Sequence, residues 1–252
     1  MEEIDGSVVI PAHNEEDKID RSLDSLEGQE AEVVVVASGD DRTAEVARSH
    51  PATDRVVEDE EGSGPGHARN LGAEEVESEV VLFTDADSEV CDDWVERHLR
   101  HYSDEEVVAV GGPVLSRDES LKHRVMFRLL SDYWYRISWP FGFVQISGVN
   151  GSYRRSTFLD EGGFDEELPM MEDTELSMRI RKRGEVIYDS DAWVRTSPRR
   201  QEGRGYVPLF LDYVKAYTDH YIRGREMDQN YFPSDEVDED EIYGDTDSQE
   251  KS

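Results

Sequence analysis

Short runs of apolar, mostly β-branched residues alternate with polar stretches of helical periodicity along the first half of the chain. Strands are expected at 7–10, 32–37, 55–57, 80–84 and 107–115, and helices at 15–26, 42–50, 66–76 and 92–102. Strands that are apolar throughout have to be covered on both faces, and their alternation with helices is typical of a parallel sheet. The pattern therefore predicts an α/β fold with a mostly parallel central sheet and helices on both faces.

Polar segments directly follow three of the predicted strands. The sequences are PAHNEE after the first strand, SGDD after the second and TDADS after the fourth. In open α/β sheets, ligands bind outside the carboxyl ends of the strands, where such segments converge. We therefore expect a binding site at this edge of the sheet.

Acidic residues outnumber basic ones along the whole chain. The 252 residues include 60 Asp and Glu against 27 Lys and Arg, a formal net charge of -33. A surface of this charge repels nucleic acid and anionic lipid at long range, so no nucleic-acid partner is expected. Such acidity is typical of proteins adapted to a high-salt cytoplasm, as in a halophilic archaeon, and an acidic mesophilic protein is the alternative.

Cysteine content and terminal sequences bear on location and domain organisation. Cys91 is the single cysteine, so no intramolecular disulfide or thiolate metal cage forms, as expected in a reducing cytoplasm. The acidic start MEEIDG does not resemble a signal peptide, and no run of about 20 apolar residues predicts a membrane span. We expect one domain over 1–232 and an acidic disordered tail over 233–252.

Asp85 and Asp87 emerge directly after the buried strand predicted at 80–84. Two carboxylates at this spacing can present oxygens to one hard divalent cation, and Mg²⁺ or Mn²⁺ combines one or two protein carboxylates with substrate phosphate oxygens. The alternative is an exposed acidic turn, because Asp-x-Asp is frequent in a chain this acidic. The position after a buried strand favours the metal site.

Two glycine- or asparagine-containing loops are further candidates for binding. Asn14 and Glu15 either cap the helix that follows the first strand or flank a nucleoside. In GPGHARNLGA, Arg69 lies one turn inside a helix, and a helix N-terminus with an arginine is suited to an anion. The glycine spacing fits neither a Walker P-loop nor a dinucleotide fingerprint.

Charged residues in the second half suggest a base and an anion site. Glu172 and Asp173 begin a predicted helix over 172–184, where they are either helix-start acids or include a general base. Arg199 and Arg200 belong to a basic island in an acidic chain. The island is either a solvated face or a site for a departing diphosphate.

Taken in order, these stretches resemble the family 2 glycosyltransferases of GT-A fold over about residues 7–205. The matching motifs are VVIPAHNEE, VVASGDDRTAEVA, GPGHARNLGA, FTDADS, NGSYRRSTFLDEGGFDE and EDTELSMRIRKRG. The resemblance implies a GT-A fold and an inverting transfer of a sugar from a nucleotide-diphosphate donor to an acceptor. It also implies Mg²⁺ or Mn²⁺ as cofactor, a nucleotide-binding half at about 1–115 and an acceptor half at about 116–232.

The resemblance assigns roles to residues that match the family's motifs. Asp173, the second acid of EDTELSM, is the expected catalytic base. Asp87 is expected to hold the metal on the donor's diphosphate, and Asp85 to reach the ribose or the metal. Other contacts with the nucleotide sugar are expected at Pro11, Ala12, Asn14, Glu15, Ser38, Asp41 and Arg69.

The acceptor side is assigned in the same way. Gly148, Asn150 and Glu172 are expected to line the sugar and acceptor pocket. Arg199 and Arg200 stand roughly where many members carry Gln-x-x-Arg-Trp, and they are expected to hold the diphosphate.

One departure concerns the segment after the second strand. Many members have Asp-Asp-Gly-Ser-Thr-Asp there, and the second aspartate of that run contacts the base. This chain has ASGDD, which leaves Asp40 or Asp41 as candidates for that contact.

The segment 121–139 has a helical apolar stripe that also carries Lys122, Arg124 and Arg128. It is either a core helix or a helix that lies in a membrane interface. The second interpretation would suit a polyprenyl-phosphate or glycolipid acceptor and a cytoplasmic protein peripheral to the inner face of the membrane. Two other functions stay open, a nucleotidyltransferase of similar fold and a non-catalytic protein that binds sugar nucleotides.

Overall fold

The computed structural model describes residues 4–60, 62–118, 120–133, 145–168, 171–198, 205–218 and 223. The chain divides into two compact units, residues 1–166 with 171–198, and residues 167–170 with 199–252. The first unit carries the sheets. In the second, the described secondary structure is helix α10, Tyr206–Tyr217. The two predicted halves of 1–232 stay a prediction, and the predicted tail over 233–252 lies outside the described residues.

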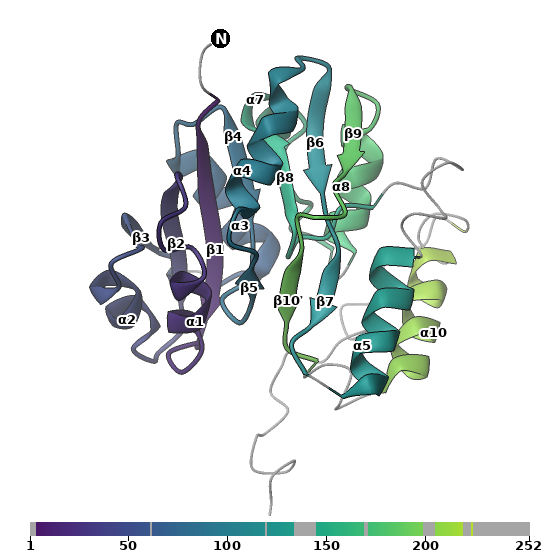
Figure 1. The fold of residues 1–252 in the computed structure, drawn as a ribbon, viewed down its shortest axis with the longest axis horizontal. Helices are drawn as coiled ribbons and strands as arrows, with labels where there is room; N and C mark the ends of the chain where they lie inside the picture. Colours follow the sequence, from purple (N-terminus) through teal and green to yellow (C-terminus); the bar gives the residue numbers. More distant parts are fainter. Residues whose placement is uncertain are drawn as a thin grey trace, which may run out of the picture. The chain divides into compact units, whose positions relative to one another are not determined.

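Within the described residues, seven strands form the main sheet of the first unit, in the order β3-β2-β1-β4-β8-β6-β9 (Figure 1). β1 pairs in parallel with β2 and β4, β2 with β3, and β6 with β9, whereas β8 runs antiparallel to both neighbours. The predicted mostly parallel α/β sheet is confirmed. The strands are β1 Gly6–His13, β2 Glu32–Ser38, β3 Arg55–Glu58, β4 Val80–Phe83, β6 Val107–Gly111, β8 Gly151–Arg154 and β9 Glu185–Tyr188.

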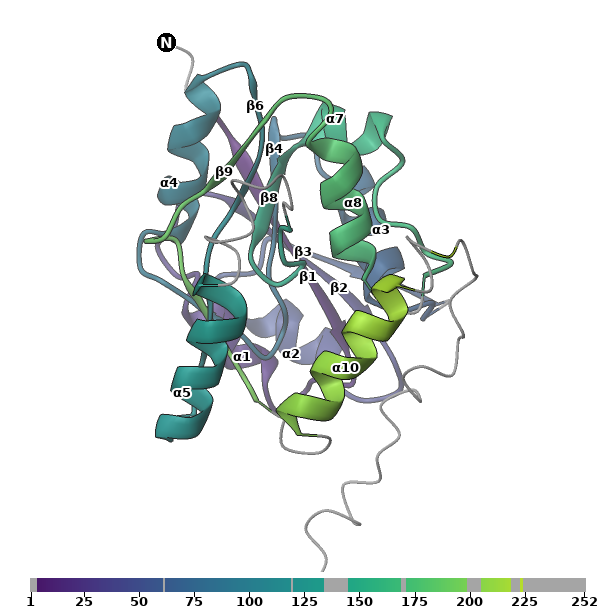
Figure 2. The same ribbon diagram turned by 90° about the vertical axis from the view of Figure 1, so that its right-hand side faces the viewer.

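Alternate residues of the central strands contribute to two hydrophobic cores, one on each face of the sheet. Val8 and Ile10 of β1 belong to the core that includes side chains of α1, α2 and α4, whereas Val9 belongs to the core with α3, α7 and α8. Figure 2 shows α4 and α8 on opposite sides of the sheet. The helices are α1 Ile19–Asp24, α2 Thr43–Ser49, α3 Pro65–Glu75, α4 Trp94–Leu99, α7 Arg155–Asp160 and α8 Glu172–Ile180.

Helix α3 packs unusually close to the sheet at Gly72. A Cβ atom there would lie 2.3 Å from Cγ1 of Val9 and 3.1 Å from Cγ2 of Val36. A glycine normally weakens a helix interior by about 1 kcal/mol relative to alanine. Here it lets the backbone of α3 rest directly on β1 and β2, which fixes the position of Arg69 one turn earlier.

The single strand predicted over 107–115 is wrong. The structure breaks it at Gly112 and Pro113 into β6 and β7, Val114–Ser116. A Cβ atom on Gly112 would lie 2.0 Å from the carbonyl oxygen of Ala192, and proline has no N–H to donate to a ladder. β7 pairs instead with β10 (Val194–Thr196) in a second, three-stranded sheet that also contains β5, Glu89–Val90.

The chain between β6 and β8 leaves and re-enters the main sheet at one point. The two strands are antiparallel neighbours, and Gly111 pairs with Gly151. Their connection contains β7, helix α5 (Leu121–Phe127) and a π-helical stretch η2, Arg128–Tyr133. The predicted helix over 121–139 is therefore two short helical segments in its described part, and residues 134–139 lie outside that part. No helix among the described residues is long and apolar enough to cross a bilayer.

Candidate active site at the carboxyl edge of the sheet

Asp85 and Asp87 lie on a turn that the protein fixes from several sides. The backbone carbonyl of Asp85 accepts hydrogen bonds from Ser22 Oγ at 3.1 Å and from Ser88 N at 3.1 Å. Oδ1 of Asp87 accepts from Thr196 Oγ1 at 3.1 Å and from Ser88 Oγ at 3.3 Å. Both carboxylates are half-buried. The alternative of an exposed acidic turn does not fit this arrangement.

Two residues at this turn were missed by the sequence analysis. Besides the Thr196 hydroxyl, the guanidinium of Arg117 contacts the turn, with Nη1 donating to the backbone carbonyl of Asp87 at 3.1 Å. No local motif marks either residue. They reach Asp87 because β7 pairs in parallel with β10, a long-range pairing that spacing along the chain does not reveal.

Arg69 is a buried cation between two acidic segments. Its side chain is 4 % exposed; Nη2 donates to Oδ1 of Asp85 at 2.7 Å, and Nη1 to Oε1 of Glu172 at 3.4 Å. Burial on its own would lower the pKa of Arg69, but the two carboxylates raise it above its ordinary value. The guanidinium therefore stays charged and joins the turn after β4 to the start of α8.

The surroundings of Arg69 explain two further residues. Its guanidinium lies 5.5 Å from the centroid of the Phe164 ring, a cation–π arrangement. On another side it meets the backbone at Gly148, where a Cβ atom would lie 3.0 Å from Cζ of Arg69. A side chain at 148 would force the Arg69 guanidinium to shift, so the close approach of the arginine favours glycine here.

Asp173 sits in the first turn of α8 in a setting that disfavours its charge. Oδ1 accepts from the Thr174 backbone N–H at 2.6 Å and Oδ2 from the Gly148 N–H at 3.4 Å. Burial, and then the neighbouring Glu172 carboxylate, raise the pKa of Asp173 to about 6, against the opposing effect of Arg69. A helix N-terminus ordinarily stabilises an ionised acid, so an upward shift is unusual for a mere helix-start residue.

One guanidinium therefore connects the predicted metal and base segments, which are more than eighty positions apart in the sequence. The structure brings together five of the predicted site residues around it. They are Arg69, Asp85, Gly148, Glu172 and Asp173.

The loop after β1 is locked against the loop after β2. Asn14 has a left-handed backbone with φ 51°, and its side-chain oxygen accepts from the Asp40 N–H at 3.0 Å. Its N–H donates to the Ser38 carbonyl at 3.3 Å. Gly39, with φ 97°, is required here because a Cβ atom would lie 2.1 Å from Oδ1 of Asn14. Asn14 therefore does not cap α1, which begins at Ile19 with no side-chain cap.

Pro11 and Ala12 lie within β1 rather than in the loop. The strand continues to His13, paired with β2 throughout, so the expected stop at Pro11 is wrong. β4 pairs only with Gly6–Val9, and beyond that point β1 has a neighbour on one side, where a proline is tolerated. Glu15 follows the strand; its N–H donates to Thr43 Oγ1 at 2.8 Å, and its carboxylate pairs with Lys18 at 3.0 Å.

The Asp41 carboxylate is committed to contacts within the protein. Oδ1 accepts from Thr43 N at 2.9 Å and Thr43 Oγ1 at 2.6 Å, and Oδ2 accepts from Glu16 N at 3.0 Å. Burial would raise the pKa of Asp41, but these hydrogen bonds lower it below its ordinary value. Asp41 thus ties Thr43, the first residue of α2, to the β1 loop, whereas Asp40 is the exposed acid of the ASGDD segment.

The prediction that Asn150 lines the sugar pocket does not fit the structure, because its side chain is fully buried. Oδ1 accepts from Trp94 Nε1 at 2.9 Å and lies 3.2 Å from His98 Nε2, and Nδ2 donates to the carbonyls of Pro113 at 3.0 Å and Ala192 at 2.8 Å. Burial lowers the pKa of His98 to about 4, so its ring is neutral. Asn150 is therefore an internal anchor for the chain that carries Gly148.

Arg199 and Arg200 lie outside the described residues.

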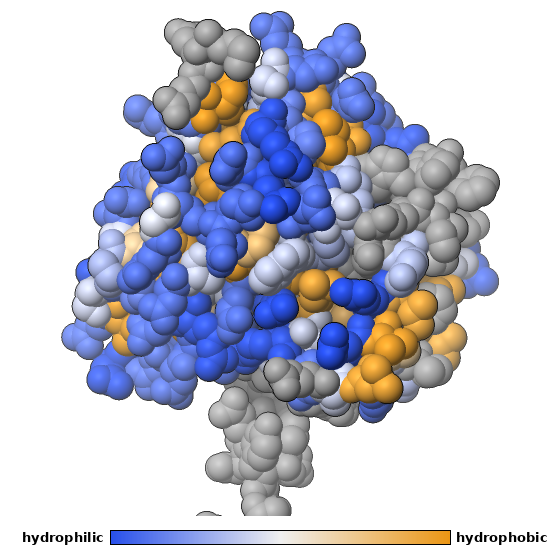
Figure 3. Space-filling model, in the orientation of Figure 1, coloured by the Kyte–Doolittle hydropathy of each residue, from blue (hydrophilic) through white to orange (hydrophobic). Residues whose placement is uncertain are grey.

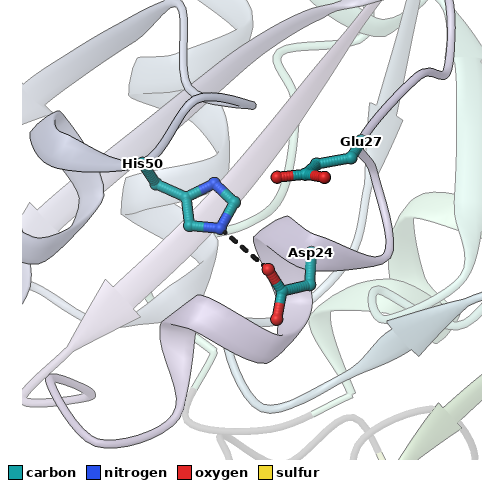
Figure 4. Close-up of side chains that lie close together, drawn as sticks. All are labelled: Asp24, Glu27 and His50. Carbon is teal, nitrogen blue, oxygen red and sulfur yellow. Dashed lines mark hydrogen bonds and ion pairs between the residues drawn. The ribbon is translucent and has the colours of Figure 1, made fainter.

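A second acidic cluster lies away from this site. Ligand atoms of Asp24, Glu27 and His50 lie within 4.8 Å of one another (Figure 4). His50 Nδ1 accepts from the Ala52 N–H at 3.2 Å, so its Nε2 carries the proton that points to Asp24 at 3.1 Å and offers no lone pair to a metal. The cluster also sits at the carboxyl ends of α1 and α2, whereas the candidate active site lies where the strands end.

Solved structures of similar fold include proteins in complex with nucleotide sugars. A mannosyltransferase from Pyrobaculum calidifontis in complex with GDP-Man and Mn²⁺ matches with a TM-score of 0.61 and 22% identity, over 83% of this chain and 64% of that one. Residues 1–349 of S. aureus TarS in complex with UDP-GlcNAc match with a TM-score of 0.64 and 24% identity, over 90% and 69%. These likenesses show that the fold is GT-A.

Curated relatives of similar sequence are also named as glycosyltransferases. The glycosyltransferase AglE of Haloferax volcanii is 34% identical over 118 residues, 43% of this chain and 38% of AglE. The pre-mycofactocin glycosyltransferase of Mycobacterium tuberculosis is 28% identical over 207 residues, 78% of this chain and 43% of the relative. The chain thus spans about two fifths of the length of these relatives.

The sequence model described as "Glycosyl transferase family 2" matches residues 7–159, which is more than half of the chain. The match includes the β1 loop, α3 with Arg69, the Asp85–Asp87 turn and the Gly148 loop. The protein therefore belongs to glycosyltransferase family 2.

Proposed function

We propose that the protein is an inverting glycosyltransferase that moves a sugar from a nucleotide-diphosphate donor to a hydroxyl or phosphate of a lipid-linked acceptor. Family membership gives glycosyl transfer as the activity. The observation that carries the finer proposal is the pair of ion contacts from Arg69, which hold Asp85 beside the segment of Glu172 and Asp173. This arrangement sets a candidate donor site next to a candidate base.

Asp85 and Asp87 suit a divalent cation. Their carboxylate oxygens are the hard ligands that Mg²⁺ and Mn²⁺ prefer, and two of them leave the other coordination positions to donor phosphates and water. Each carboxylate is oriented by a neighbour, Arg69 for Asp85 and Thr196 for Asp87. The ion would supply positive charge to the departing diphosphate. The complex of the Pyrobaculum mannosyltransferase with Mn²⁺ supports the choice of ion.

Asp173 is the proposed general base for a hydroxyl acceptor. Its pKa of about 6 leaves it ionised at neutral pH yet more basic than an ordinary aspartate. A carboxylate oxygen takes the hydroxyl proton while the acceptor oxygen bonds to the anomeric carbon. The bond from that carbon to the donor phosphate oxygen breaks, and the nucleoside diphosphate leaves with the electron pair. Attack opposite the leaving group inverts the configuration.

The lipid-linked acceptor has separate support. A 4,4'-diaponeurosporenoate glycosyltransferase of Staphylococcus haemolyticus is 40% identical over 91 residues, 33% of this chain and 24% of the relative. Its name describes an apolar substrate. We place the protein on the cytoplasmic side, peripheral to the membrane, where such an acceptor and a nucleotide sugar can meet.

A panel of UDP- and GDP-sugars tests the proposal. Hydrolysis or transfer should require Mn²⁺ or Mg²⁺, and should be lost with a chelator or in Asp85→Asn and Asp87→Asn. Asp173→Asn should reduce turnover by about 10²–10⁴-fold while donor affinity stays within about threefold. Asp92→Asn removes the same charge from an exposed residue near the same turn and serves as the matched control.

Two outcomes contradict the proposal. Turnover of Asp173→Asn close to wild type removes this residue from the chemistry. Binding of a nucleotide sugar without any hydrolysis or transfer identifies a non-catalytic binding protein instead.

A further inference from the structure

The helical segment from Leu121 to Tyr133 presents an exposed apolar stripe. Leu121, Val125, Leu129 and Tyr133 follow one another at intervals of four, and they are 76%, 44%, 49% and 51% exposed. Figure 3 shows apolar side chains gathered over α5. Among the described residues, the other exposed large apolar side chains are Leu211 and Val214 of α10.

The same segment also has a buried side. His123 and Phe127 are each 7% exposed, and α5 packs against β7. The segment is thus apolar on its inner side and on part of its outer side. This explains why the sequence pattern fits both a core helix and an interfacial helix. A single helix that is apolar on more than one face has a second apolar partner as well as its own core.

Basic residues flank the exposed stripe. Lys122, Arg124 and Arg128 are all exposed, and the one acid among residues 121–133 is Asp132. The described residues provide no carboxylate partner for Arg124 or Arg128 within ion-pair distance. In a chain with a net charge of -33, this segment is locally basic. Apolar side chains between cations are typical of helices that lie in an anionic membrane interface.

We propose that the Leu121–Tyr133 segment docks the protein on a lipid bilayer, with the apolar stripe in the headgroup boundary and Arg124 and Arg128 on lipid phosphates. A second copy of the chain fits less well. Its acidic surface would suit the arginines, but pairing of the stripe with the same stripe of a second copy would bring the arginines of both copies face to face. The other exposed apolar side chains among the described residues, Leu211 and Val214, are two against the four of the stripe.

Both ends of this connection reach the candidate active site. Before α5, Arg117 contacts the backbone carbonyl of Asp87, and after it the Gly148 N–H contacts Asp173. A bilayer bound at α5 would therefore contact the chain between β6 and β8, and this same chain reaches Asp87 and Asp173. This link to a lipid-borne acceptor rests on the proposed function, whereas the docking itself does not.

Sedimentation of the full chain with vesicles tests the docking. Phosphatidylglycerol and phosphatidylcholine vesicles are compared at about 1 M KCl, where a Debye length of ~3 Å screens the repulsion from the acidic body but not contacts at the helix. We expect wild type to pellet with both and more strongly with phosphatidylglycerol. Val125→Glu and Leu129→Glu should each weaken binding by about tenfold or more.

A double variant separates the electrostatic from the apolar contribution to vesicle binding, and a further variant serves as the control. Arg124→Gln with Arg128→Gln should remove the preference for phosphatidylglycerol and leave binding to phosphatidylcholine. Ser103→Glu adds a negative charge at an exposed position of the turn after α4 and should bind as wild type. Circular dichroism and thermal melts check that each variant is folded, and donor hydrolysis should be unchanged in all of them.

The outcomes are distinct. Failure of wild type to pellet, or pelleting of Leu129→Glu at the wild-type level, overturns the docking even if the enzyme hydrolyses its donor. A dimer in sedimentation velocity that Leu129→Glu converts to a monomer overturns it in favour of a second copy. Vesicle binding that depends on the stripe supports the docking even if no donor is turned over.

Discussion

Asp173 carries its negative charge at a cost that the protein does not fully compensate. Its carboxylate is removed from water and lies next to Glu172, and the hydrogen bonds from Thr174 and Gly148 offset only part of this. Arg69, the nearest cation, has its two terminal nitrogens on Asp85 and Glu172. A carboxylate left in this state has a high affinity for a proton, as a general base requires.

Activity should therefore show an acidic limb set by Asp173. With a pKa of about 6, we expect kcat/KM to fall to half near pH 6 and tenfold for each further pH unit below it. Because Glu172 is the second cause of the raised pKa, Glu172→Gln should move this limb to lower pH. A pH–rate profile of donor hydrolysis measures both, and a limb that stays near pH 6 in Asp173→Asn would assign it to another group.

The same shift has a consequence for stability with a definite sign. Between the ordinary value near 3.8 and about 6, the folded chain binds more protons at Asp173 than the unfolded chain does. The stabilisation this provides is present at low pH and is lost as pH rises through 6, up to about 3 kcal/mol. Asp173→Asn should accordingly gain in melting temperature relative to wild type between about pH 4 and pH 7. A pH-independent difference would contradict the raised pKa.

At the scale of elements, Asn150 joins four segments that are distant in sequence. It binds Trp94 and His98 of α4, the carbonyl of Pro113 at the β6–β7 break and the carbonyl of Ala192 before β10. The ring of His98 continues the network to Ser152 of β8 at 2.8 Å, and Ser152 to Tyr102 at 2.8 Å. A buried network in which every member has partners fixes the relative positions of its segments.

Replacement of Asn150 distinguishes an anchor from a pocket residue. Asn150→Ala removes a partner from the buried ring nitrogens of Trp94 and His98 and from the Ala192 carbonyl, whereas the Pro113 carbonyl keeps the Val194 N–H at 3.0 Å. We therefore expect a loss of about 3 kcal/mol or more in the free energy of unfolding. Denaturant titration measures this loss. A residue that lines a pocket would instead raise the KM for donor or acceptor with little change in stability, and that result would restore the pocket assignment.

The elements predicted from sequence are those with a strong periodic signal. The sequence shows β1, β2, β4 and α3 clearly. Their apolar side chains pack into the hydrophobic cores, and this produces a regular apolar pattern along the chain. The break between β6 and β7 was missed although Gly112 and Pro113 signal it. The course of the chain after the break depends on the carbonyl of Ala192, about eighty residues away. β8 and α7 were missed as well, since Asn150-Gly151 and Gly162-Gly163 predict turns and hide a strand whose partners lie far along the chain.

The candidate site, too, contains residues that the sequence predicts and residues that it does not. Asp85, Arg69 and Asp173 were predicted because family motifs mark them, and the structure brings their segments together. Thr196 and Arg117 were not, since only the pairing of β7 with β10 brings them to Asp87. The prediction that Asn150 lines a pocket does not fit its burial, because a motif position says nothing about burial, which is set by the segments that close over the residue.

At the scale of the whole molecule, the excess of acidic residues controls the response to salt. With a net charge of -33, the folded chain repels itself, and this repulsion is larger than in the expanded unfolded chain. Raising KCl from about 0.1 M to 1 M shortens the Debye length from ~10 Å to ~3 Å and should remove most of the difference. This behaviour is expected of a protein adapted to concentrated salt.

Thermal melts test the salt response. We expect the melting temperature to rise by roughly 5–10 °C over this range, which corresponds to a few kcal/mol for a chain of this size. Sucrose at equal osmolality provides the control, because it acts by exclusion from the surface without screening charge. An equal rise in sucrose and KCl, or no rise in KCl, would contradict the electrostatic explanation.

The pairing of Gly111 with Gly151 makes the intervening chain a replaceable insert. The connection 112–150 leaves and re-enters the main sheet at this one rung, so the length and composition of its part beyond β7 and Arg117 can vary without changing the strand order of the main sheet. The loops after β1 and β2, to which the sequence assigns contacts with the nucleoside, are built from other parts of the chain. On the proposed function, exchange of this one insert is expected to give enzymes that share a sugar donor and differ in what they glycosylate.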